Sequence, residues 1–204
     1  MAADDGAVER LLDLDQRSFS AMRDISALLG EMQHMMRDLA RRNEELEMLA
    51  TTDPLTGLAN RRGFDEELSR EEARARRERA GAAVIAFDVR KLKNVNDRYG
   101  HSVGDDLLRA VGVALRTSAR KSDVVARLGG DEFAALLPGA SRAGGEIFLD
   151  RVRASVRSLL LPTGGAVPVQ LSAGVAVRDE AESLQEALQL ADGRLLLDKQ
   201  RTSA

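Results

Sequence analysis

Two glycines followed at once by two carboxylates are the residues of this sequence best suited to chemistry. The segment 127–133 reads Arg-Leu-Gly-Gly-Asp-Glu-Phe, and apolar runs flank it on both sides. Because Gly129 and Gly130 can adopt positive φ without strain, the segment predicts a β-hairpin with Asp131 and Glu132 at its tip. Adjacent carboxylates repel each other, and their hard oxygen atoms suit Mg²⁺. An ordinary solvated turn is the competing interpretation of these residues alone.

A third carboxylate follows the apolar run 82–87, which is typical of a buried strand. If that strand pairs with the hairpin, Asp88 lies near Asp131 and Glu132, and three carboxylates at one end of a sheet require counterions. One or two Mg²⁺ ions there would hold a triphosphate and activate a hydroxyl for in-line attack. Taken alone, Asp88 is better explained as a strand-end cap.

The elements that must position these carboxylates follow from the apolar pattern. We expect strands over 82–87 and 167–177, the hairpin, and helices over 61–80, 104–120, 141–160 and 180–199. Asn60 is placed to cap the first of these helices, and the segment with Asn94, Asn96 and Asp97 is expected to be a loop. The order predicts an α+β fold, a ferredoxin-like βαββαβ palm with helices on one face of a mainly antiparallel sheet.

Residues 1–50 are expected to form a long helix that precedes a globular domain of residues 51–204. From Met22 onward, the spacing of the apolar residues alternates between three and four positions, which is typical of the seam of a left-handed coiled coil. The predicted seam contains Met22, Ile25, Leu29, Met32, Met36, Leu39, Asn43, Leu46 and Ala50. Asn43 falls at a core position, where a polar residue fixes the register at some cost in stability. The pattern favours a homodimer or a higher oligomer. A monomeric helix packed on its own domain is the alternative.

The composition of the 204-residue chain excludes several classes of function. Its net charge of −3 argues against broad electrostatic binding to nucleic acid or to an anionic membrane. The absence of cysteine excludes disulfides, zinc–thiolate sites and thiol catalysis. The sequence shows no secretory signal and no membrane segment of roughly 20 apolar residues, so we expect a cytoplasmic protein.

Five ordered segments of the chain carry a resemblance to a known family. They are 53–62, 93–101 with Gly104 and Asp105, 129–133, 172–176, and Ala191–Asp192 with Lys199. Together they resemble the GGDEF domains, the diguanylate cyclases, over nearly all of the globular part. The resemblance implies a palm-like fold, condensation of two GTP into cyclic di-GMP with release of two pyrophosphates, and a requirement for Mg²⁺ or Mn²⁺.

The resemblance also implies roles at the metal and at the reacting hydroxyl. Asp88 and Asp131 are the implied metal ligands, with help from the backbone carbonyl of Val89. Glu132 is expected beside the metals as a fourth residue of the metal site, where it would also assist deprotonation of the attacking 3′-hydroxyl. Catalysis is therefore assigned to Glu132, Asp131 and Asp88.

Six residues resemble contacts to the nucleotide: Asn96, Asp105, Lys93, Lys199, Gly129 and Gly130. Asn96 and Asp105 would hydrogen-bond guanine, and Asp105 favours a guanine-only product over a mixed guanine–adenine one. Both lysines are candidate phosphate contacts, although a surface role is a strong alternative for Lys93. A helix N-terminal acid is the structural alternative for Asp105.

Arg120 and Asp123 form an R-x-x-D element, with five residues between Asp123 and Gly129. In the family this element is an inhibitory site for cyclic di-GMP, because Arg and Asp can present complementary groups to guanine. Arg151 or Arg153 is a candidate to complete it from a neighbouring helix.

Several positions depart from the family pattern. Arg90 stands where a second Asp is common, and Thr202 and Ser203 stand where the family has a Gly-Arg pair. These departures bear on turnover and on triphosphate affinity. They leave open an alternative in which the domain binds GTP or cyclic di-GMP without converting it and signals to a partner. A purely structural oligomerisation protein is disfavoured, because it would not need Asn96 and Asp105.

Overall fold

The computed structural model describes residues 22, 28–43, 46–157 and 169–201. Contacts within the chain divide it into two units, Met1–Met48 and Leu49–Ala204. Within the described ranges, no helix is both long enough and apolar enough to span a bilayer.

The N-terminal segment is helical over 28–43 and 46–51. The described large apolar residues of the predicted seam are 52–66% exposed in the single chain: Met22, Leu29, Met32, Met36, Leu39 and Leu46. Ala50, at the end of the seam, is half-buried. Ile25, a further seam residue, lies outside the described residues. An exposed apolar row of this length is typical of an interaction surface.

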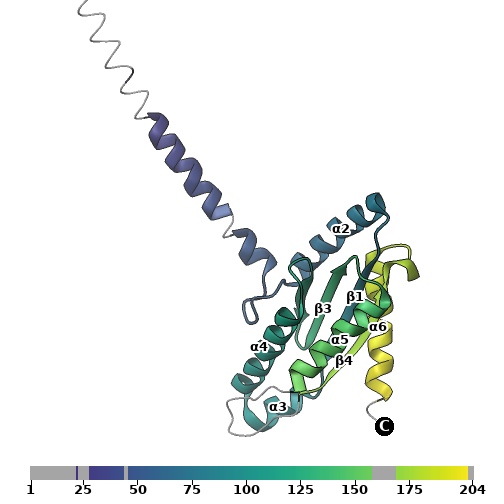
Figure 1. Ribbon diagram of the computed structural model, residues 1–204. Helices are drawn as coiled ribbons and strands as arrows, with labels where there is room; N and C mark the ends of the chain where they lie inside the picture. Colours follow the sequence, from purple (N-terminus) through teal and green to yellow (C-terminus); the bar gives the residue numbers. More distant parts are fainter. Residues whose placement is uncertain (1–21, 23–27, 44–45, 158–168, 202–204) are drawn as a thin grey trace, which may run out of the picture. The chain divides into compact units, whose positions relative to one another are not determined.

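The globular unit contains a four-stranded sheet, which confirms the predicted α+β palm (Figure 1). The strand order is β2 (Val124–Gly129), β3 (Glu132–Pro138), β1 (Ala82–Val89) and β4 (Leu171–Val177). All neighbouring pairs are antiparallel, and the register places Asp88 between Glu132 on β3 and Ser172 on β4. The end of β1 and the hairpin tip therefore meet at one end of the sheet, as the sequence predicts.

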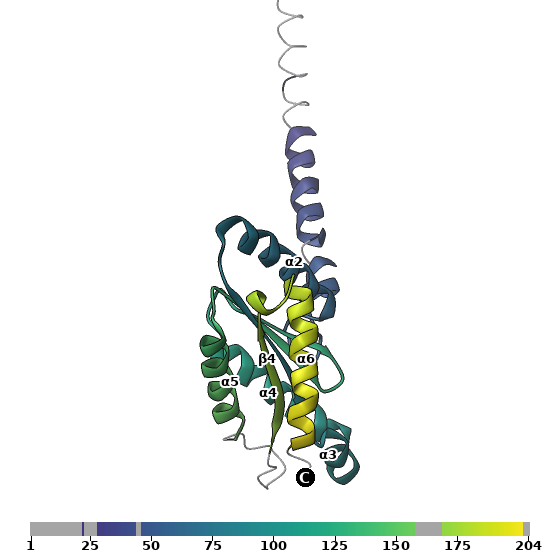
Figure 2. The same cartoon turned by 90° about the vertical axis from the view of Figure 1, so that its right-hand side faces the viewer.

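Helices cover both faces of this sheet, whereas the sequence-based expectation placed them on one. The core on one face contains residues of α4 (His101–Ser118) and α5 (Arg142–Arg157). The core on the other contains residues of α2 (Arg61–Glu78) and α6 (Leu184–Arg201). Figure 2 shows α5 and α6 on opposite sides of β4. Every residue of β1 is buried, which explains its unbroken apolar run, since a strand covered on both faces needs no polar alternation.

One expected loop is a helix. The segment with Asn94, Asn96 and Asp97 belongs to α3 (Leu92–Tyr99), which buries Val95 against the core of α4 and α5. Gly100, with φ of 88°, ends α3 and starts α4, so α4 begins three residues earlier than the expected position 104. Burial of one apolar side chain outweighs the weak helix propensity of asparagine and aspartate.

The remaining boundaries differ by smaller amounts. Asn60 caps α2 as predicted, because its Oδ1 accepts from the Gly63 backbone N–H at 3.0 Å. β4 begins at Leu171 rather than 167, although part of the expected range lies outside the described residues. A 3₁₀ turn, η1 (Arg178–Glu180), occupies the start of the last expected helix, so α6 begins at Leu184.

β4 is an edge strand, and side chains occupy outward-facing backbone groups along it. The Ala173 N–H donates to Asp198 at 3.0 Å, and the Val175 carbonyl accepts from Arg194 at 2.7 Å. The Val177 N–H donates to Glu180 at 3.1 Å. These three bonds attach helix α6 and turn η1 to the strand.

Candidate active site

The hairpin tip has the backbone conformation that its two glycines predict. Gly129 has φ of 149° and Gly130 has φ of 53°, values that side chains rarely allow. A register irregularity between Arg127 and Gly129 marks a bulge just before the tip. The tip thereby presents Asp131 next to the end of β1, where the Val89 N–H donates to the Asp131 carbonyl at 3.0 Å.

Asp88 is the most buried carboxylate at this end of the sheet, with its side chain 11% exposed. Burial raises the pKa of Asp88, and the nearby Asp131 charge raises it further, whereas Lys199 and Arg90 oppose the shift. The Lys199 ammonium lies 2.5 Å from Asp88 Oδ2 and supplies the positive charge beside this carboxylate. The arrangement of a desolvated carboxylate, a second carboxylate and hard oxygen donors fits a divalent cation.

Glu132 lies to one side of this pair. Its side chain is 55% exposed and lies 3.6 Å from the Arg61 guanidinium. Burial raises the pKa of Asp192 on α6, and the Glu132 charge adds to that increase. Within the described part of the chain, no three His, Cys, Asp or Glu residues gather closely enough to hold a metal. The structure thus brings Asp88 and Asp131 together and turns Glu132 toward Arg61.

The two residues expected to contact guanine lie on consecutive helices, Asn96 on α3 and Asp105 on α4. Asn96 Oδ1 is buried and accepts no hydrogen bond from the described residues. Gly104 packs directly against this oxygen, and a Cβ at position 104 would overlap it. An unsatisfied buried acceptor costs about 1–3 kcal/mol, so the site favours a hydrogen-bond donor arriving from outside. The sequence pattern includes Gly104 in a family-like segment but does not predict its close packing against Asn96.

The remaining expected ligand contacts lie at the surface or in a turn. Lys93 is exposed on α3. The Arg120 backbone N–H donates to Asp123 Oδ2 at 2.8 Å, so the R-x-x-D spacing forms a tight turn between α4 and β2. On α5, the Arg151 guanidinium lies 5.7 Å from the centre of the Phe148 ring. Arg153 instead pairs with Asp198, 3.1 Å away, beside strand β4.

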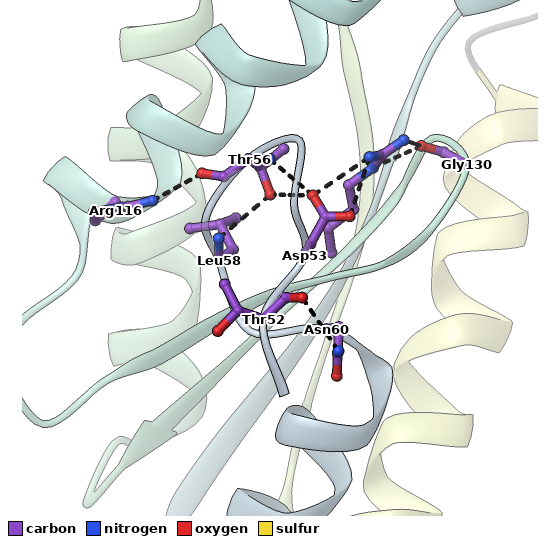
Figure 3. Close-up of polar contacts among 8 residues, drawn as sticks. Thr52, Asp53, Thr56, Leu58, Asn60, Arg116 and Gly130 are labelled. Atoms are coloured by element: carbon purple, nitrogen blue, oxygen red, sulfur yellow. Dashed lines mark hydrogen bonds and ion pairs between the residues drawn. The ribbon is translucent and has the colours of Figure 1, made fainter. Parts of the chain in front are cut away.

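A residue that sequence reasoning missed is Arg127, which holds the hairpin tip. Its Nε and Nη2 donate to the Gly130 carbonyl at 3.0 and 2.7 Å, and its Nη1 lies 3.3 Å from Asp53 Oδ2. Asp53 in turn accepts from the Thr56 N–H and hydroxyl at 2.8 and 2.6 Å (Figure 3). Burial alone would raise the pKa of Asp53, but the Thr56 hydrogen bonds and Arg127 outweigh it and lower the pKa.

Asp53, Thr56 and Arg127 therefore form one network that attaches the signature tip to the turn before α2. The side chains of Arg127 and Asp53 are only 13% and 16% exposed. The signal that could have revealed this network is the arginine placed two residues before the glycine pair. Its fork geometry is suited to a carbonyl and a carboxylate at once.

Comparison with known proteins adds relatives along the whole globular unit. Diguanylate cyclase DgcP from Pseudomonas aeruginosa is 33% identical over 175 residues, which are 84% of this chain and 26% of that protein. Diguanylate cyclase TpbB from the same species is 39% identical over 167 residues, which are 81% of this chain and 38% of that protein. The chain therefore spans less than half the length of these curated relatives.

Solved structures show the same fold. One is the coiled coil and GGDEF domain of DgcB from Caulobacter crescentus, solved in complex with c-di-GMP, with a TM-score of 0.79 at 30% identity. The match covers 86% of this chain and 94% of the DgcB chain. Diguanylate cyclase SiaD from Pseudomonas aeruginosa, solved in complex with its activator SiaC, has a TM-score of 0.73 at 35% identity. The match covers 96% of this chain and 75% of the SiaD chain. The family model described as "Diguanylate cyclase, GGDEF domain" matches residues 50–203. The chain therefore belongs to the GGDEF family.

Proposed function

We propose that this protein is a diguanylate cyclase, which condenses two GTP into cyclic di-GMP and releases two pyrophosphates. The observation that carries the proposal is the buried Asp88 beside Asp131, at a hairpin tip formed by Gly129 and Gly130. The relatives named diguanylate cyclase support it. Because the proposed substrate is GTP, we expect the reaction to take place in the cytoplasm.

Asp88 and Asp131, with the Val89 carbonyl, would hold Mg²⁺ or Mn²⁺. When bound, the metal neutralises phosphate charge and lowers the pKa of the attacking hydroxyl. Lys199 now lies against Asp88, so a cation at the carboxylates would release its ammonium to contact the phosphates. Glu132, exposed beside the tip, would accept the proton of the 3′-hydroxyl.

Guanine would lie against α3 and α4. The Asn96 side chain, whose oxygen is buried and unsatisfied, would meet a donor of the base, and the Asp105 carboxylate would accept from guanine N1–H and the 2-amino group. Adenine offers no such pair of donors, so Asp105 favours a guanine-only product. Lys93 would contact phosphate from the exposed side of α3.

The reaction needs two nucleotides, so each domain would hold one GTP and face a second copy. We assign residues 1–50 to dimerisation and residues 51–204 to the cyclase. The exposed apolar row on the N-terminal helix supports a homodimer, with a higher oligomer also compatible. Linking the two domains raises their effective concentration and sets their orientation.

Arg120 and Asp123 are the proposed inhibitory site for the product. The turn between α4 and β2 holds the two residues together and leaves Arg120 exposed. The Arg120 guanidinium can present a fork to phosphate or to the Hoogsteen edge of guanine. A relative, DgcB, has been solved in complex with c-di-GMP.

A second candidate is a domain that binds GTP or cyclic di-GMP without converting it and signals to a partner. The observation that favours it is the pairing of Glu132 with Arg61 and of Asp88 with Lys199, which engages both carboxylates within the protein. A relative, SiaD, has been solved with an activator protein, so a partner is compatible with either candidate.

The deciding experiment is incubation of the purified chain with GTP and Mg²⁺, with nucleotides resolved by chromatography. Wild type should form cyclic di-GMP, and Glu132→Ala should not. Glu67→Ala is the matched control, because it removes an exposed carboxylate that pairs only with Arg70 among the described residues. Bound nucleotide without product at high protein concentration would favour the second candidate.

A further inference from the structure

A pocket lined by three arginines lies at the same end of the sheet as Asp88. It encloses about 420 Å³ and is lined by Arg90, Arg153, Arg157, Gln170 and Asp198, among others. Small-molecule sites usually span about 300–1,000 Å³, so the pocket is large enough for a small ligand. Arg90 directly follows β1 and Gln170 directly precedes β4, whereas Arg153 and Arg157 lie on α5 and Asp198 lies on α6.

The pocket carries an excess of positive charge. Three guanidinium groups face one carboxylate, Asp198, whose Oδ2 lies 3.1 Å from Arg153 Nη2. Arg157 makes no hydrogen bond or ion pair to any residue that the structure describes, and it is exposed. Its guanidinium is therefore available to an anion, and arginine binds phosphate oxygens through two parallel hydrogen bonds.

Two residues of the pocket are chain neighbours of candidate active-site residues. Arg90 follows Val89 on the chain, and Asp198 precedes Lys199. The Arg90 N–H donates to the Gln170 carbonyl at 2.9 Å, which attaches the end of β1 to the wall of the pocket. Arg90 is also close enough to Asp88 to act on it electrostatically.

We propose that this arginine pocket binds the terminal phosphates of the nucleoside triphosphate whose reacting end lies at Asp88 and Asp131. The inference rests on the proposed function and extends it to residues outside the hairpin. A metal-bound triphosphate keeps a net negative charge of about 2, which the positive charge of the pocket, with the Arg157 guanidinium foremost, complements. Arg90 and Arg157 would then act on substrate affinity rather than on the reacting hydroxyl.

The test compares nucleotide binding by wild type, Arg157→Gln and Arg157→Lys, using titration calorimetry with Mg²⁺. The probes are GMP, inorganic pyrophosphate and 3′-deoxy-GTP, which lacks the attacking hydroxyl and cannot react. Arg157→Gln should weaken 3′-deoxy-GTP binding about tenfold and leave GMP binding unchanged. Arg157→Lys should recover part of the loss. Arg70→Gln, an exposed arginine of α2 paired with Glu67, is the matched control and should change nothing.

Equal losses for GMP and 3′-deoxy-GTP, or no loss for either, would overturn the proposal. Weaker binding of pyrophosphate alone, with 3′-deoxy-GTP unaffected, would also overturn it, because the pocket would then hold a separate anion. The proposed function fails differently. If wild type makes no cyclic di-GMP but binds 3′-deoxy-GTP in an Arg157-dependent manner, the pocket assignment stands and the cyclase assignment does not.

Discussion

Replacing Arg127 by Gln should destabilise the protein and slow catalysis by loosening the hairpin tip. The change removes two hydrogen bonds to the Gly130 carbonyl and a largely buried ion pair with Asp53. Breaking a buried pair by deleting one partner costs about 3–5 kcal/mol. Because the Thr56 hydrogen bonds still stabilise Asp53, we expect the lower end, about 3 kcal/mol of unfolding free energy.

The catalytic effect should fall on kcat more than on KM. A displacement of about 1 Å of reacting groups can cost about 10²-fold in rate, whereas the residues expected to contact guanine lie on α3 and α4 and stay in place. Urea unfolding and initial rates of cyclic di-GMP formation would measure the two effects. A double-mutant cycle with Asp53→Asn should give a coupling energy of about 1–2 kcal/mol.

Arg109→Gln is the matched control, because Arg109 forms an exposed pair with Asp106 on α4 at 2.6 Å. Such a pair is worth less than about 1 kcal/mol. If Arg127→Gln unfolds within about 0.5 kcal/mol of wild type and turns over within about twofold, Arg127 does not position the tip.

Three further results are expected. Gly104→Ala should lower the unfolding free energy by about 1 kcal/mol or more in chemical denaturation, because a Cβ overlaps Asn96, whereas Gly→Ala in a helix usually stabilises. Hydrogen bonds from Arg178 lower the pKa of Glu72 to about 2. Ionised Glu72 therefore stabilises the fold above its ordinary pKa of 4.5, and about 1–2 kcal/mol of unfolding free energy is lost as the pH falls toward 2. Chemical denaturation at a series of pH values should show this loss for wild type and not for Glu72→Gln. Leu39→Lys should shift the oligomer toward monomer in sedimentation and reduce turnover per chain; an unchanged oligomer would exclude the exposed seam as the dimer contact.

The arrangement of the sheet could be predicted because its determinants are local. The unbroken apolar run of β1 and the Gly-Gly pair both specify backbone states that few other residues would adopt. Helix α3 could not be predicted, because its polar residues favour a loop and only the burial of Val95 reverses that preference. Coverage of the second face by α2 and α6 differs from the expected single layer of helices, although the unbroken apolar run of β1 is typical of a strand buried on both faces.

The candidate site also contains contacts that the sequence pattern predicts and contacts that depend on tertiary packing. Proximity of Asp88 and Asp131 follows from strand pairing, which the sequence pattern predicts. The direction of Glu132 depends on Arg61, a residue of α2 that is close only in the folded chain. Arg127 and Asp53 are 74 positions apart, so their contact is set by tertiary packing rather than by any local pattern.

The side-chain bonds along β4 have a consequence for how two copies of the protein can meet. An edge strand with open backbone groups can join the edge of another molecule into a continuous sheet, and such contacts seldom come apart. Here Asp198, Arg194 and Glu180 already engage the strand at Ala173, Val175 and Val177, so joining would first break hydrogen bonds to charged groups. In the proposed dimer, two domains brought together by their N-terminal helices would thus be kept from joining into one sheet through this edge. They could meet for the proposed reaction and separate again after it.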